Sequence, residues 1–143
     1  MSDPKTSQLK LEADSWAEFE GLLGHIARDR WEEPGVLDGW TLKEMLWHVG
    51  GWLRKCASNL EAFAAGREEQ DSELTVDETN ERLAAEARSM DSDAVWVAVV
   101  EARELVRKRF QELPDVDERA IQELADETYE HYPEHLPDLR AFG

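Results

Sequence analysis

The chain has 143 residues, 41% of them hydrophobic, which is enough for one domain with a buried core. Its 33 acidic residues outnumber its 16 basic ones, and the formal net charge of -17 disfavours nucleic acid and anionic membranes, since both attract Lys and Arg clusters. Cys56 cannot form an internal disulfide, and no segment resembles a signal peptide or a membrane span. We therefore expect one cytoplasmic domain over residues 1–143.

Apolar residues recur at helical spacing from the N-terminal third onward. The first such pattern covers residues 16–26 and ends near residues 33–35, which read Glu-Pro-Gly. Thr41 and Glu44 then have the spacing of a capping box. The helix that they open is expected to run to about Ala65.

Three further helical patterns follow. Gly66 offers a C-terminal stop, and a second capping-box pair predicts a shorter helix over residues 75–87. The next helix begins at residue 91 or 92 and ends before Pro114, and the last pattern covers residues 121–136. Four main helices, one minor helix and no sustained strand alternation predict an all-α, antiparallel bundle.

The four histidines differ in their positions on these helices. At about 100° per residue, His25 lies opposite Trp16 and is expected to face solvent. His48 lies at the edge of the core-facing stripe and points into a seam between helices. A lone half-buried histidine is usually a hydrogen-bonded structural residue, so His48 alone does not define a site.

His131 and His135 are separated by three residues, so on one helix both imidazoles share a face. That face points toward the core, where imidazoles are costly unless their nitrogens are satisfied. A divalent metal ion would satisfy them, with His48 as the remaining inward histidine. Such pairs are also common by chance. Pro133 either ends the helix, which weakens the shared-face argument, or bends it so that both rings converge.

Three segments, in this order, resemble the DinB/YfiT-like superfamily. They are GWTLKEMLWHVGGW (residues 39–52), DETNER (residues 77–82) and TYEHYPEH (residues 128–135). The resemblance implies an up-down-down-up four-helix bundle, often dimeric. It also implies a zinc or nickel ion held by three histidines, which correspond here to His48, His131 and His135.

Characterised members of that superfamily include mycothiol-dependent maleylpyruvate isomerases and S-transferases that use bacillithiol or mycothiol. We therefore expect a metal-dependent transferase or hydrolase of a small molecule, with a low-molecular-weight thiol as cosubstrate. The alternative is a non-catalytic protein that binds a small molecule or protects against a toxin. Trp47 faces away from the core by its helical phase, which favours a homodimer unless a nearby loop covers it.

Several other residues are candidates for the surroundings of the ion. Trp52, Tyr129 and Tyr132 are candidate walls of a substrate pocket, with ordinary core packing as the alternative. Glu130 or Glu134 is placed to orient a ligand imidazole, with plain surface charge as the alternative. The sequence assigns no catalytic residue.

Overall fold

The computed structural model describes residues 3–34, 39–68 and 74–142, and these ranges are helical with no extended strand. The predicted all-α class is confirmed. Two short 3-10 helices, η1 and η2, accompany the α-helices. The elements are α1 (Pro4–Leu23), η1 (Arg28–Arg30), α2 (Leu42–Ala64), α3 (Val76–Arg88), α4 (Ser92–Gln111), α5 (Glu118–Glu127), η2 (Tyr132–His135) and α6 (Leu136–Phe142). None of the described helices has both the length and the apolar composition needed to cross a membrane.

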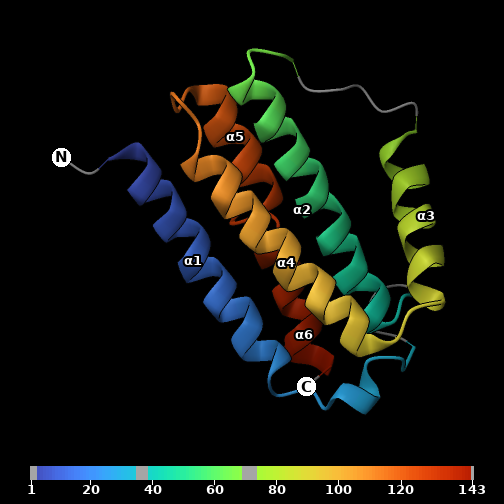
Figure 1. The fold of residues 1–143 in the computed structure, drawn as a ribbon. Coiled ribbons are helices and arrows are strands. Elements are labelled where there is room, and N and C mark those ends of the chain that lie inside the picture. Colours follow the sequence, from blue (N-terminus) through green and yellow to red (C-terminus); the bar gives the residue numbers. More distant parts are fainter. Residues whose placement is uncertain (1–2, 35–38, 69–73, 143) are drawn as a thin grey trace.

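The long helices pack side by side with mixed directions. Figure 1 shows α2 and α4 running the same way, and α1 and α5 running the opposite way. The outer face of α2 is covered by α3, and α6 lies near the C-terminal end of α1. Fully buried apolar side chains fill the space between these helices. They include Phe19, Leu42, Met45, Leu46, Leu53, Leu60, Val99, Phe110, Leu124 and Leu139.

Side-chain caps begin the helices where the sequence predicted them. The hydroxyl of Thr41 accepts a hydrogen bond of 3.1 Å from the backbone N–H of Glu44 at the start of α2. At the start of α3, Thr75 and Glu78 form a full capping box, and Asp91 caps α4. These local contacts explain why the N-termini of three helices could be predicted from the sequence.

Two predicted helix ends are wrong. The first helix ends at Leu23, and the chain continues as a turn and η1 instead of one long helix. The last long helix ends at Glu127, because Thr128 leaves helical geometry with φ -123 and ψ -95. An α-helix continued past this point would meet Pro133, whose ring clashes with the preceding turn and which has no N–H to donate.

Gly51 allows α3 to approach α2 closely. A Cβ atom at this position would lie 2.6 Å from a methyl carbon of Leu83, closer than real side chains pack. The close approach matters because Asn80, about one helical turn before Leu83, faces the same part of α2.

Trp47 is buried, contrary to prediction. Only 8% of the residue is exposed, and its indole N–H donates to a carboxylate oxygen of Glu86 on α3 at 3.2 Å. The guanidinium of Arg54 lies 4.2 Å from the ring centroid. Helix α3 covers Trp47, which belongs to the buried core. The argument for a homodimer from an exposed tryptophan is therefore wrong.

Candidate metal centre

Three histidines from two distant parts of the chain meet at one point. His48 lies on α2, His131 lies in the turn after α5, and His135 is the last residue of η2. The Nε2 atom of His131 is 3.1 Å from the Nε2 atoms of both other histidines. All three residues are buried, and their candidate ligand atoms lie within 4.8 Å of one another. By contrast, His25 is exposed, as predicted.

Hydrogen bonds among the three histidines cannot satisfy all of their ring nitrogens. A neutral imidazole nitrogen carries either one proton or one lone pair, so Nε2 of His131 can form a hydrogen bond with only one of its two neighbours. In addition, the buried Nδ1 atom of His135 has no hydrogen-bond partner. The arrangement thus differs from that of hydrogen-bonded structural histidines.

The spacing of the nitrogens suits a metal ion. Two imidazole nitrogens bound to one zinc ion at about 2.0–2.1 Å each lie about 3.0–3.4 Å apart. Two of the three separations, 3.1 Å each, fall in this range, and all three ligand atoms lie within 4.8 Å of one another. The residues present therefore fit a divalent ion held by three histidines.

The histidines are in the protonation state that binds metal. Burial lowers the pKa of His48 and of His131 from 6.5 to about 4, and that of His135 to about 3. The charge of His131 lowers the pKa of the other two further. All three imidazoles are therefore neutral at pH 7, and neutral imidazole is the form that coordinates a metal.

Asn80 determines which nitrogen of His48 carries the proton. Its side-chain oxygen lies 3.0 Å from Nδ1 of His48 and 2.8 Å from the indole nitrogen of Trp52. Because an indole N–H can only donate, the atom that Asn80 presents is its carbonyl oxygen. The Nδ1 atom of His48 must then donate as well, which leaves the lone pair of Nε2 directed at the other histidines. Sequence reasoning did not single out Asn80, whose only signal was its place in the DETNER segment.

The two C-terminal histidines converge without sharing an α-helical face, so that part of the prediction is wrong. The α-helix ends before them, and Pro133 lies in the first turn of η2, where its missing N–H costs no hydrogen bond. The backbone N–H of His131 donates to the carbonyl of Thr128, and its carbonyl accepts from Glu134. The rings of His131 and His135 end with centroids 4.9 Å apart.

Tyr132, between these histidines, anchors the segment in the core. Its hydroxyl donates to a carboxylate oxygen of Glu12 at 2.9 Å, and both residues are completely buried. The same carboxylate accepts from Arg103 at 2.8 and 2.9 Å and from Arg107 at 2.7 Å. Core packing is thus the correct interpretation of Tyr132. Tyr129 binds Gln8 instead and does not line the cavity described next.

A cavity of about 320 Å³ opens beside His48 and His131. Trp52 forms part of the wall of this cavity, as predicted, and Glu134 lines the cavity as well. Sequence reasoning missed its other two carboxylates, because no motif contained them. The described lining residues are His48, Trp52, Val76, Asn80, Asp126, Glu127, His131 and Glu134. Burial, followed by the charge of Glu123, raises the pKa of Glu127 to about 8.

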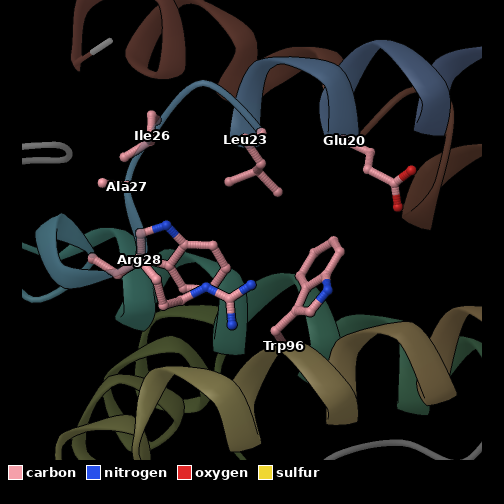
Figure 2. Close-up of a pocket in the computed structure, with 8 residues that line it drawn as sticks. Glu20, Leu23, Ile26, Ala27, Arg28 and Trp96 are labelled. Atoms are coloured by element: carbon pink, nitrogen blue, oxygen red, sulfur yellow. The ribbon is translucent and has the colours of Figure 1, made fainter.

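A larger cavity, of about 500 Å³, lies at the C-terminal end of α1. Figure 2 shows Glu20 and Leu23 of α1 facing Trp96 of α4 across it, with Arg28 at the side. No histidine or cysteine occurs among its described lining residues, and Arg28 already pairs with Asp93. We place the candidate site at the smaller cavity, because the clustered groups with strongly shifted pKa values line it.

Comparison with known families identifies the family of the chain. Residues 13–128 match the mycothiol maleylpyruvate isomerase N-terminal domain family. The chain belongs to this family. The family is DinB/YfiT-like, so the predicted superfamily is confirmed. The match includes His48 and ends three residues before His131. Searches of curated proteins and of solved structures found no match.

Proposed function

We propose that the protein holds a divalent metal ion through the Nε2 atoms of His48, His131 and His135, and uses it to transform a small molecule. The meeting of three neutral imidazole nitrogens that cannot satisfy one another carries this proposal. Zinc or nickel is the expected ion, since imidazole suits both. Three protein ligands are typical of catalytic rather than structural zinc sites, because a coordination position remains for water or substrate.

A bound ion would lower the pKa of a water or thiol, so that a nucleophile exists near neutral pH. The chain's own residues supply the ligands of the ion and the walls of the site. Its three neutral ligands add no charge of their own, and Asn80 keeps His48 in the coordinating tautomer. Trp52 and Val76 form apolar walls on the approach to the histidines.

We further propose a thiol-dependent transfer reaction, with hydrolysis as the alternative reaction. The family description names mycothiol, which is a low-molecular-weight thiol and therefore a model for the cosubstrate. We also propose that α1, α2, α4 and α5 form an up-down-down-up bundle with α3 as the extra helix. The shared direction of α2 and α4 supports this assignment. The buried, unpaired Cys56 is compatible with the predicted cytoplasmic location.

Metal analysis of protein purified without a chelator tests the site. We expect about one ion per chain, and about 4 kcal/mol of added stability when free metal exceeds its dissociation constant a thousandfold. His48→Ala should lower the affinity for the ion at least about tenfold. His25→Ala is the matched control, because His25 is exposed and should leave affinity unchanged. Absence of metal, with no stabilisation by added zinc or nickel, would refute the proposal.

A second experiment separates catalysis from simple binding. The metal-loaded protein is incubated with a model electrophile and a low-molecular-weight thiol, and loss of the thiol is followed over many equivalents. Multiple turnovers that disappear in His48→Ala support the transferase. Uptake that stops at one equivalent per chain favours the non-catalytic alternative. The predicted homodimer stays a prediction, which light scattering of the purified protein would test.

A further inference from the structure

We infer that the cavity beside the three histidines selects small molecules that carry a positively charged amine at the end remote from the histidines. The inference deepens the proposed function and rests on it for the identity of this cavity as the substrate site. It concerns the charge of the substrate, which the histidines alone do not specify.

The described part of the cavity is lined by carboxyl groups and by no cation. Its described lining residues include Asp126, Glu127 and Glu134 but no lysine or arginine. Within the ranges 3–34, 39–68 and 74–142, none of these three carboxylates forms an ion pair. Asp126 accepts a hydrogen bond of 2.6 Å from the side chain of Gln122, a neutral donor.

Charges outside the lining act on this field in both directions. Burial, followed by the charge of Glu123, raises the pKa of Glu127 to about 8, so Glu127 is largely protonated at pH 7 and the rim charge comes from Asp126 and Glu134. Lys55 is the cation that acts on Glu127, and its Nζ lies 4.9 Å from the ring centroid of Trp52. A net charge of -17 adds to the negative potential, which a concave site concentrates.

The position of the carboxylates sets where a charged group would lie. Asp126 and Glu134 are exposed, whereas the histidines are buried, so negative charge lies toward solvent. The apolar surfaces of Trp52 and Val76 lie along the same cavity and suit a short alkyl linker. A molecule with a metal-binding atom at one end and an amine at the other matches this order.

Three small thiols that differ in charge test the inference. They are cysteamine, which is cationic, 2-mercaptoethanol, which is neutral, and mercaptoacetate, which is anionic. Their binding to zinc-loaded, ¹⁵N-labelled protein is followed through the indole N–H resonance of Trp52, which lines the cavity. Cysteamine should bind roughly tenfold more tightly than mercaptoacetate at low salt, and about twofold more tightly near ~0.5 M salt.

Variants separate the rim charge from the different acidities of the thiols. The double variant Asp126→Asn/Glu134→Gln should reduce the ratio of the two dissociation constants at least about threefold. Glu130→Gln is the matched control, because Glu130 is exposed, neighbours the site in sequence and does not line the cavity. It should leave the ratio at the wild-type value. Salt dependence in the wild-type protein remains a test should the double variant fail to fold.

Failure of the proposed metal site and failure of the charge inference give different results. Failure to bind zinc, measured first in the same samples, refutes the proposed metal site. If zinc binds, no shift with any thiol refutes the assignment of this cavity as the thiol site. Three results overturn only the charge inference: equal or reversed preference, a preference insensitive to salt, and a preference that survives in a folded double variant.

Discussion

Asn80 shows how one neutral side chain can prepare a metal ligand. Its carbonyl oxygen accepts from His48 and Trp52 together, so the indole N–H holds the amide in the orientation that the imidazole needs. Without this contact His48 is free to adopt the other tautomer, in which Nε2 carries a proton and cannot coordinate. The site therefore depends on a residue that is not itself a ligand.

Asn80→Ala should lower the affinity for zinc about 10–100-fold, because His48 loses the partner that fixes its tautomer and orientation. Competition with a chromophoric chelator measures the affinity. Thr79→Ala is the control, since its hydroxyl donates to the carbonyl of Thr75, the N-cap residue of the same helix. An affinity of Asn80→Ala within twofold of the control would show that packing alone orients His48.

At the scale of elements, the buried carboxylate of Glu12 joins α1 and α4 to the segment that carries two ligands. Tyr132, Arg103 and Arg107 all donate to it, and it is completely buried. A buried ion pair adds little stability over apolar packing, but removal of one partner leaves an uncompensated charge. The contact holds Tyr132, and therefore both neighbouring histidine positions, against the core.

Glu12→Gln should lower the free energy of unfolding by about 3–5 kcal/mol, because it removes a completely buried carboxylate from the half-buried charges of Arg103 and Arg107. Glu18→Gln, also on α1, breaks the exposed pair with Arg140 and should cost less than about 1 kcal/mol. Urea titrations measure both. Should Glu12→Gln not fold, Tyr132→Phe removes one donor at a cost of about 1–2 kcal/mol. Equal effects of the two glutamate changes would contradict the role of the buried carboxylate.

At the scale of the whole molecule, the buried groups make stability depend on pH. The histidines have folded pKa values of about 3 to 4, against 6.5 when unperturbed, so the unfolded chain binds more protons below about pH 6.5. Their stabilisation is present above that pH and is lost as the pH falls toward 4. Glu127 acts in the opposite sense. Its folded pKa of about 8 exceeds 4.5, so its stabilisation is full below pH 4.5 and is lost as the pH rises through 8.

Metal-free protein should lose stability from about pH 7 to about pH 5, by roughly 1–2 kcal/mol for each histidine, with Glu127 offsetting part of the loss. Glu127→Gln should therefore lose stability more steeply over this range, and His135→Ala less steeply. Chemical unfolding at both pH values measures the slopes. Glu130→Gln serves as the control and should keep the wild-type slope. A slope in Glu127→Gln equal to the control would refute the role of Glu127.

The sequence by itself determined the features that depend on local contacts and periodicity. Helix starts were predictable because Thr41, Thr75 and Asp91 bond to backbone groups within the next three residues. The inward placement of His48 followed from its helical phase. The resemblance of three ordered segments then identified the superfamily, which the family match confirms.

Only the tertiary structure decided how the site is assembled. His131 and His135 converge through a turn and a 3-10 helix, a geometry that depends on Tyr132 reaching Glu12 more than one hundred residues away. Asn80, Asp126 and Glu127 lie on other helices than His48, so no local spacing revealed them. Burial of Trp47 likewise depends on α3, since helical phase tells which way a side chain points but not what packs against it. The physical reason is common to all of these: long-range packing sets which distant groups meet.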